Sequence, residues 1–328
     1  MKVIIPVAGQ GTRLRPHTLL RPKMLLPIAG KPILGHIVDA LIAQGLEEFV
    51  FVVGYLRDQI EQYIHNNFDI QATFIHQEPP KGLGHAIYLA GEVLNPEEPI
   101  LIVLGDTIFD ANLTLVMESP YTTLGVREVE DPRRFGVAVL DENGFVKQVV
   151  EKPEKIISHL ALVGIYFIKR SGSLLSALQE IIEKNVQKNG EFWLTDGIQL
   201  MLDRGEPMTV FNVEGWFDCG RKETLLETHR KILERIPPAE ITVDKCTIIP
   251  PVYIHPEARI SRSVIGPYVS IARGCVITNS VVRDTIIDMH TEIKNLVLAH
   301  SIIGHHVRLN GAAQNINVAD YSVIENIK

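Results

Sequence analysis

The feature that most constrains the fold is an aliphatic repeat in the last part of the chain. Isoleucines recur there every sixteen or seventeen residues, at Ile254, Ile271, Ile287 and Ile303. Three short strands per coil, each turning one aliphatic side chain inward, would stack such units into a small parallel β-helix. Helical periodicity stops at Pro238, so we expect this domain to occupy residues 239–328. With about three or four coils, the solenoid needs a cap from the first domain or from another subunit.

Residues 1–238 show a different pattern, in which apolar runs of strand length alternate with segments at helical spacing. The runs 48–54 and 99–104 are nearly all apolar, as is typical of strands buried inside a parallel sheet. Further strands are expected at 72–76, 136–140, 145–150 and 162–168, and helices at 34–42, 58–66, 84–93, 173–188, 195–204 and 221–235. This alternation predicts an α/β fold with a doubly wound, mostly parallel sheet and a ligand crevice at the carboxyl ends of its strands.

The first apolar strand runs directly into a glycine turn that cations follow. Gly9 and Gly11 come first, and Arg13 and Lys23 stand just downstream. Glycines let the backbone approach a bulky anion, and the amides of such a turn point at phosphate oxygens that Arg and Lys neutralise. A dinucleotide fingerprint fits poorly, because Leu14 occupies the place of its third glycine. For the glycine pair alone, an ordinary tight turn is the alternative.

The stretch GQGTRLRPHT (9–18), with PK (22–23) and LLP (25–27), resembles the signature loop of the sugar-1-phosphate nucleotidylyltransferases. These enzymes make nucleotide sugars and release pyrophosphate. The resemblance spans nearly the whole chain, and the repeat is similar to the left-handed β-helix of long-form members. It implies Rossmann-like topology in residues 1–238 and a nucleotide site built from Ala8, Gly9, Gly11, Thr12, Arg13, Gln77, Pro80, Gly82 and Asp106.

Two aspartates follow apolar strands, Asp106 in the pair GD (105–106) and Asp218 in WFDCG (216–220). Nucleotidyl transfer must bring together two anions that repel each other, and Mg²⁺ held by carboxylates and phosphate oxygens meets that need. By the resemblance, both aspartates match the family's metal ligands, and Arg13, Lys23 and Lys152 complete the catalytic set. Taken alone, Asp218 also suits the N-cap of the helix that follows it.

A second group of motifs resembles the sugar side of the family. In the triplet EKP (151–153) the glutamate would contact sugar hydroxyls and the lysine the sugar phosphate. The resemblance implies sugar-phosphate contacts from Gly136, Glu151, Lys152, Gly164, Tyr166 and Glu191. In isolation, the triplet also fits an exposed charge pair before a proline.

Base selection is expected in the segment QEPPKGLGHA (77–86), which is similar to that of thymidylyl- and uridylyltransferases. A glutamine has a donor and an acceptor, so Gln77 can pair with the N3–H and a carbonyl of thymine or uracil. The sequence of residues 81–86 is more similar to that of uridylyltransferases. Residues 15–18 and the β-helix instead resemble the long-form thymidylyltransferases. The resemblance implies Mg²⁺-dependent transfer from dTTP to glucose-1-phosphate, with UTP as the alternative donor.

Charge and cysteine content exclude several other classes. A net charge of −7 speaks against a nucleic-acid surface, which needs a basic face. Three cysteines without a C-x-x-C pair (Cys219, Cys246 and Cys275) suit reduced thiols, and the apolar run before Gly9 is too short for a signal peptide or membrane span. We therefore expect a cytoplasmic protein without a nucleic-acid or membrane partner.

Two rival functions stay open at this point. The chain could be a non-catalytic, nucleotide-sugar-binding regulatory subunit, although the intact catalytic set argues against it. It could also carry an acyltransferase in its tail, where His290, His300, His305 and His306 are candidate bases. We expect those histidines to face solvent in turns. Because an exposed solenoid end leaves strand edges unpaired, we expect a homo-oligomer to which the β-helix contributes.

Overall fold

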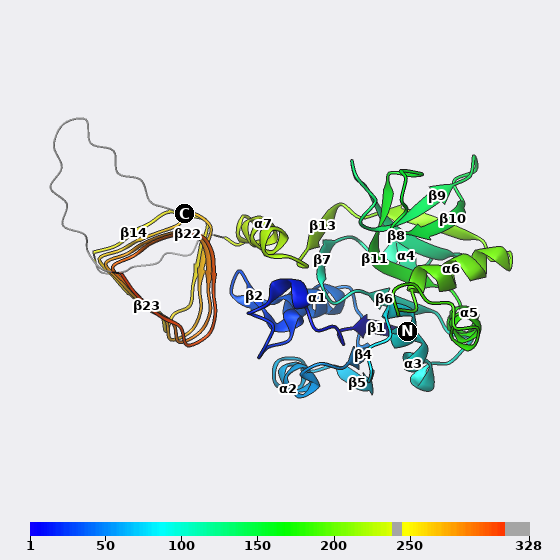
Figure 1. Ribbon diagram of the computed structural model, residues 1–328, viewed down its shortest axis with the longest axis horizontal. Helices are drawn as coiled ribbons and strands as arrows, with labels where there is room; N and C mark the ends of the chain where they lie inside the picture. Colours follow the sequence, from blue (N-terminus) through cyan, green and yellow to red (C-terminus); the bar gives the residue numbers. More distant parts are fainter. Residues whose placement is uncertain (238–244, 312–328) are drawn as a thin grey trace. The chain divides into compact units, whose positions relative to one another are not determined.

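The computed structural model describes residues 1–237 and 245–311. The chain divides into two compact units, Met1–Thr228 and His229–Lys328 (Figure 1). The boundary predicted at residue 238 falls on residues outside the described ranges, so it stays a prediction.

A mixed sheet forms the centre of the first unit. Four strands run parallel in the order β6-β1-β4-β5: β1 (Lys2–Pro6), β4 (Glu48–Val53), β5 (Gln71–His76) and β6 (Ile100–Val103). Beyond β6 lies β11 (Leu160–Ile168), which runs antiparallel to it. The other strands of the sheet continue from β11: β8 (Thr122–Glu128), β9 (Gly136–Leu140), β10 (Val146–Glu151) and β12 (Met208–Asn212). The predicted α/β class is confirmed. The four strands that lie side by side in parallel all come from residues 2–103.

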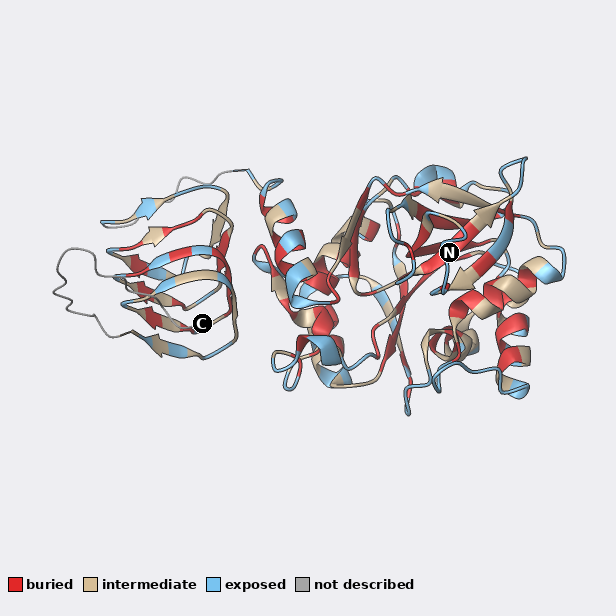
Figure 2. Ribbon diagram, turned by 45° about the horizontal axis from the view of Figure 1, so that its top comes forward, coloured by how far each residue is buried: buried red, intermediate tan, exposed pale blue. Residues whose placement is uncertain are grey.

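The parallel strands are apolar along their length because both faces of the sheet are covered. On one face, Ile4, Val50 and Ile102 join a core to which Ile87 and Leu178 contribute from helices. Figure 2 shows buried residues along these strands and on the inner sides of the helices. The helices of the first unit are α1 (Ile33–Ile42), α2 (Arg57–Asn67), α3 (Leu83–Ala90), α4 (Thr114–Met117), α5 (Ser171–Glu183) and α6 (Leu194–Asp203). The next helix, α7 (Lys222–Leu233), contains the division between the two units.

Helix α5 ends five residues earlier than the predicted 173–188. Asn185 adopts a left-handed conformation (φ 52°), which an α-helix does not continue. The amide of Val186 then donates to the carbonyl of Ile181 at 2.9 Å, and that of Asn185 donates to Ile182 at 3.1 Å. The helix is therefore closed by a Schellman motif that helical spacing does not reveal.

Several short elements were not predicted. Among them, β7 matters most, because it pairs antiparallel with β13, the strand that was predicted to end at Asp218, and brings residues 107–110 beside residues 215–218. The short elements are η1 (Thr12–Leu14), η2 (Lys23–Leu25), η3 (Gly91–Val93), β2 (Pro27–Ile28), β3 (Lys31–Pro32), β7 (Thr107–Asp110) and β13 (Gly215–Asp218).

The second unit is a parallel β-helix, whose coils Figure 1 draws as nested triangular outlines. Its strands are β14 (Thr247–Ile248), β15 (Val252–Ile254), β16 (Arg259–Ser261), β17 (Val264–Ile265), β18 (Val269–Ile271), β19 (Val276–Thr278), β20 (Val281–Ile287), β21 (Glu292–Lys294), β22 (Val297–Ile303) and β23 (Arg308–Asn310). The four repeating isoleucines stand in register, Ile254 beside Ile271, Ile271 beside Ile287, and Ile287 beside Ile303. All four pack in one core, so the repeat is confirmed.

Candidate functional site

The site lies where the parallel strands of the first unit end. Gly9 follows β1, Gln77 follows β5 and Asp106 follows β6, so the parallel order collects them at one edge of the sheet. Gly11 is left-handed (φ 62°), and a Cβ there would lie 2.8 Å from the Cβ of Lys23. A side chain at position 11 would therefore push Lys23 away from this edge.

Lys23 and Asp106, both predicted catalytic residues, form an ion pair. The Nζ of Lys23 donates to Oδ2 of Asp106 at 2.6 Å, with the lysine side chain 8% and the aspartate side chain 37% exposed. Burial by itself would raise the pKa of Asp106, but the ammonium of Lys23, assisted by the charge of Arg13, lowers it below its ordinary value. Asp106 is therefore a carboxylate at neutral pH.

The β7–β13 ladder brings Asp218 beside Asp106. Asp218 pairs with Thr107 across the ladder, and the amide of Cys219 donates to the carbonyl of Asp106 at 3.1 Å. One carboxylate oxygen of Asp218 accepts from the amide of Gly220 at 2.8 Å. The two predicted metal ligands are thus neighbours along the backbone ladder, although they lie 112 positions apart in the sequence.

The donor set suits a hard cation that also binds substrate. In the described part of the chain, no group of three or more His, Cys, Asp or Glu side chains could hold a metal by itself. Mg²⁺ is commonly held by one or two carboxylates together with substrate phosphates, so Asp106 and Asp218 fit it. Burial raises the pKa of the nearby Cys219 thiol, which leaves the sulfur protonated and a poor ligand.

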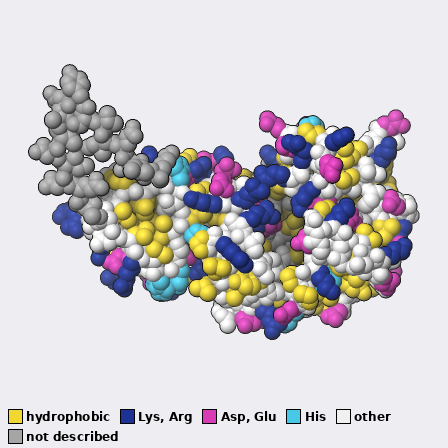
Figure 3. Space-filling model, viewed as in Figure 1, with side chains coloured by type: hydrophobic (Ala, Val, Ile, Leu, Met, Phe, Trp, Pro, Cys, Tyr) yellow, Lys and Arg dark blue, Asp and Glu magenta, His cyan; other side chains and the backbone are white. Residues whose placement is uncertain are grey.

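One hollow of about 250 Å³ contains most of the predicted nucleotide residues. Its lining includes Ala8, Gly9, Gln77, Pro80, Gly82 and Asp106. Gly11, Thr12, Arg13 and Lys23 do not line it, and Thr12 and Arg13 are exposed. On the face of the first unit seen in Figure 3, Lys and Arg side chains gather beside a hollow.

A second hollow, of about 240 Å³, contains most of the predicted sugar residues. Its lining includes Gly136, Glu151, Lys152, Tyr166 and Glu191. It shares Leu83, Leu104 and Glu191 with the first hollow, so the two adjoin.

Gly164 is the predicted sugar residue that does not line this hollow. Its carbonyl accepts from the amide of Leu104 at 2.9 Å, and Leu104 forms part of the wall. A Cβ on Gly164, whose φ is 86°, would lie 2.6 Å from the Leu104 side chain. The glycine therefore acts on the wall through Leu104.

Lys152 and Glu151 present opposite charges to the second hollow. Lys152 is left-handed (φ 44°) and its amide donates to the carbonyl of Phe135 at 3.0 Å, which turns the chain out of β10. Glu151 accepts from the hydroxyl of Thr195 at 3.2 Å and lies 3.5 Å from the Lys152 ammonium. Burial and the charge of Glu151 raise the pKa of Tyr166, so its phenol stays neutral.

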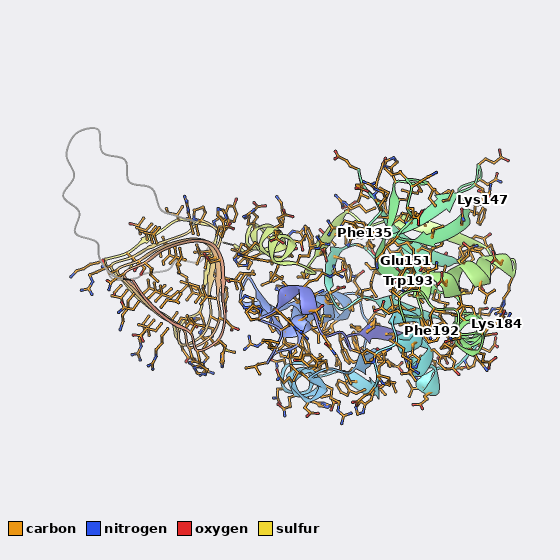
Figure 4. The ribbon with its side chains drawn as sticks, in the orientation of Figure 1. Phe135, Lys147, Glu151, Lys184, Phe192 and Trp193 are labelled. Carbon is orange, nitrogen blue, oxygen red and sulfur yellow. The ribbon has the colours of Figure 1, made fainter. Side chains whose placement is uncertain are left out.

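The sequence analysis missed Trp193, which lines the same hollow just before α6. The ammonium groups of Lys152 and Lys188 lie 5.2 Å and 5.0 Å from the centroid of its ring. Figure 4 shows Trp193 close to Glu151 in projection, and both line this hollow. The only signal for Trp193 in the sequence was an aromatic residue two positions after the candidate Glu191. Such a pattern is equally typical of a residue in the hydrophobic core.

The segment predicted to select the base, residues 77–86, is hydrogen-bonded to the segment that carries Trp193. The amide of Gly84 donates to the carbonyl of Phe192 at 2.8 Å, and the amide of Phe192 donates to that of Lys81 at 2.9 Å. A Cβ on Gly82 would lie 2.7 Å from the Phe192 carbonyl oxygen, so this close approach depends on glycine. The segments predicted to contact the nucleotide and the sugar are therefore joined by backbone hydrogen bonds.

Three of the four tail histidines lie in turns as expected, whereas His300 lies within β22 (Val297–Ile303), so the expectation of a turn is wrong for that residue. His290, His300, His305 and His306 are all exposed. Among the described residues, no helix is long and apolar enough to cross a membrane.

Comparison with known proteins identifies similar chains of both base preferences. A model of the nucleotidyl transferase family matches residues 2–235. A glucose-1-phosphate thymidylyltransferase of Streptomyces antibioticus is 30% identical, over 99% of this chain and 99% of its own. A UTP–glucose-1-phosphate uridylyltransferase of Haloferax volcanii is 32% identical, over 71% of this chain and 97% of its own.

A solved structure is similar to the first part of the chain. A UDP-glucose pyrophosphorylase complexed with UDP-glucose has a TM-score of 0.63 at 27% identity, and the match covers 72% of this chain and 99% of that one. The full-length similarity to the Streptomyces protein extends further, into the β-helix.

Proposed function

Because the chain belongs to the nucleotidyl transferase family, we propose that it transfers a thymidylyl group from dTTP to glucose-1-phosphate and releases pyrophosphate. The family and its relatives support a sugar-1-phosphate nucleotidylyltransferase. The choice of dTTP rests on the relatives that match over nearly the full length, which are thymidylyltransferases. UTP is the second candidate donor, favoured by the Haloferax relative and by the wording of residues 81–86.

The observation that carries the proposal is the pair of adjoining hollows. One contains Asp106 and borders the glycine turn, and the other contains Lys152 and Glu151. Their common wall of Leu83, Leu104 and Glu191 is where the α-phosphate of a nucleotide and the phosphate of a sugar would meet. Holding two anions in line is the main task of phosphoryl-transfer catalysis.

The residues of the chain divide this task by charge. Lys152 would orient the attacking phosphate, while Arg13 and Lys23 stabilise charge on the transferred and leaving phosphates. Asp106 and Asp218 would hold Mg²⁺, which when bound supplies neutralisation of the triphosphate. Since orientation and electrostatics suffice for a direct displacement, we expect no covalent intermediate. Ping-pong kinetics would contradict that expectation.

Pyrophosphate release measures the reaction directly. With Mg²⁺, the purified chain is tested with dTTP, UTP, GTP, ATP and CTP against the 1-phosphates of glucose, mannose, galactose and N-acetylglucosamine. We expect the highest kcat/KM for dTTP with glucose-1-phosphate, and loss of activity in EDTA that Mg²⁺ restores. A preference for UTP would identify a uridylyltransferase, the second candidate. If the folded protein released no pyrophosphate with any substrate pair, a regulatory subunit would be favoured.

The β-helix is proposed to join subunits of a homo-oligomer. The end coils of a solenoid in general leave strand edges that pair readily with another chain. Light scattering of the full chain and of residues 1–237 tests this, because removal of the tail should lower the mass per particle to that of a smaller assembly. Coenzyme A release from acetyl-CoA would instead support an acyltransferase tail.

A further inference from the structure

The side chain of Gln77 is held by two hydrogen bonds that decide its orientation. Gln77 is 4% exposed, and its Nε2 lies 2.9 Å from the carbonyl oxygen of Gly82 and 3.1 Å from Nδ1 of His85. A backbone carbonyl can only accept, so the amide atom that faces it must be the NH₂ group. The flipped amide would place two acceptors against each other.

His85 must accept the second hydrogen of that NH₂ group. Its Nδ1 is therefore unprotonated, and the neutral ring carries its hydrogen on Nε2. The ring stacks on Phe192, with centroids 6.4 Å apart, in the segment fastened to this loop. Burial, assisted by the nearby charge of Lys81, lowers the pKa of His85, so the neutral form is favoured.

With both N–H groups used, Gln77 has only its carbonyl oxygen left for a ligand. Among the hydrogen bonds of residues 1–237 and 245–311, none engages Oε1 of Gln77. Gln77 lines the 250 Å³ hollow and a neighbouring one that Ala8 and Pro80 also border. The residue is nearly buried, yet its oxygen is not among the buried atoms that lack a partner, so it is available at the wall of the hollow to accept from a ring N–H of a ligand.

We propose that His85 is a positioning residue that locks Gln77 as an acceptor, so that the site selects bases with an N3–H, uracil and thymine, over cytosine. This rests on the proposed function, because it assigns the base end of the donor nucleotide to this hollow. Cytosine presents a bare N3 acceptor, which a fixed carbonyl oxygen repels. Gln77 therefore reads the base through its acceptor alone, rather than through a donor and an acceptor together.

The charges around His85 determine how the lock responds to pH. Lys81, on the loop before α3, is the charge that acts on His85, and Asp106 and Glu191 are the acidic residues that line the hollow with Gln77. Protonation of Nδ1 would set an N–H against the NH₂ group of Gln77 and break the bond. Since the folded pKa is below the ordinary value of about 6.5, the lock persists through neutral pH and fails only as the pH falls through the lowered value.

Two variants separate positioning from packing. His85→Phe keeps a flat ring against Phe192 but has no acceptor, whereas His85→Asn places an amide oxygen near the position of Nδ1. We expect His85→Phe to raise the KM for dTTP and UTP about fivefold and to reduce discrimination against CTP, with the sugar-1-phosphate KM unchanged. His85→Asn should stay within about twofold of the parent. Equal nucleotide KM values in His85→Phe and the parent would overturn the proposal.

The pH profile gives a readout that packing does not influence. In the parent chain, the nucleotide KM should rise at acid pH more steeply than in His85→Asn, which has no imidazole. Phosphate titration of the substrates is common to both proteins and cancels in the ratio. A constant ratio across the acid range would contradict the lock.

Nitrogen NMR tests the tautomer without any turnover. In uniformly ¹⁵N-labelled full chain, the imidazole signal that disappears in His85→Asn belongs to His85. It should show an unprotonated Nδ1 and a protonated Nε2, and the opposite tautomer would overturn the proposal. The labelled protein could show the expected tautomer and yet release no pyrophosphate from dTTP or UTP. The proposed function would then be wrong, whereas the hydrogen bond from Gln77 to His85 would be confirmed.

Discussion

The hollow proposed for the nucleotide, which contains Gln77 and Asp106, and the hollow proposed for the sugar phosphate, which contains Lys152, adjoin, yet they are built in different ways. The first depends on backbone: on Gly82, where a Cβ would meet Phe192, and on the strand ends that place Gln77 and Asp106. The second depends on side chains, among them Lys152, whose side chain is 52% exposed and lies near Glu151 and Trp193. Backbone-built sites fail when a Cβ is added, whereas side-chain sites change in proportion to the contact removed.

The largest effect is expected at Asp106 and Asp218, the carboxylates proposed to hold Mg²⁺. Asp218→Asn keeps the oxygen that accepts from Gly220 but loses the negative charge that would hold Mg²⁺. We expect kcat to fall about a thousandfold, because a metal ion supplies several kcal/mol of charge stabilisation. Steady-state pyrophosphate release measures it, with Asp69→Asn, an exposed loop aspartate, as control. Comparable losses in both variants would refute the specific role.

The next largest effect should separate the two hollows. Lys152→Ala removes the ammonium from the sugar side, so the KM for glucose-1-phosphate should rise about thirtyfold, as for the loss of a charge-assisted hydrogen bond. The nucleotide KM should change little. Lys155→Ala, an exposed lysine three residues further on, serves as control. If the variant raised the nucleotide KM instead, the assignment of the two hollows would be reversed.

A smaller effect is expected from a methyl group on the nucleotide side. Gly82 has φ 93° and ψ 173°, a region open essentially to glycine alone, and a Cβ there meets Phe192. Gly82→Ala should cost about 1–3 kcal/mol of unfolding free energy and raise the nucleotide KM about tenfold, since it displaces the carbonyl that holds Gln77. Urea unfolding and initial rates measure both.

Gly144→Ala is the matched control, because its φ of 83° is also positive but a Cβ there meets nothing within 4 Å. It should lose stability and keep the nucleotide KM. An unchanged nucleotide KM in Gly82→Ala would show that the loop tolerates the shift and would weaken the contrast between the hollows.

The smallest effect should come from the aromatic wall of the sugar side. Trp193→Leu removes the ring beside Lys152 and Lys188, and a partly exposed cation–π contact is worth about 0.5–1 kcal/mol. The glucose-1-phosphate KM should then rise about threefold, with kcat unchanged. Trp193→Phe should restore most of the difference. An identical response of Phe and Leu variants would mean that the ring acts only by filling space.

Most of the first unit's architecture was predictable because strand and helix periods differ and because glycine turns follow buried strands. Asp106 and Gln77 could be found in the sequence for the same reason, since each comes directly after a strand. Trp193 could not, because an aromatic residue before a helix is equally typical of a hydrophobic core. The strand that ends at Asp218 was also predicted, but its partner β7 was missed, since the pairing of two segments far apart in the sequence leaves no local pattern.

The sequence by itself determined the two kinds of unit, the spacing of the β-helix coils and the residue types of the site, because local periodicity and motif chemistry are written along the chain. Only the tertiary structure decided that Asp218 lies beside Asp106 and that Lys23 pairs with Asp106. It also decided that the side-chain NH₂ group of Gln77 donates to Gly82 and His85. Such choices depend on which segments meet in space and which hydrogen-bonding atoms burial leaves without water, and neither is a local property of the chain.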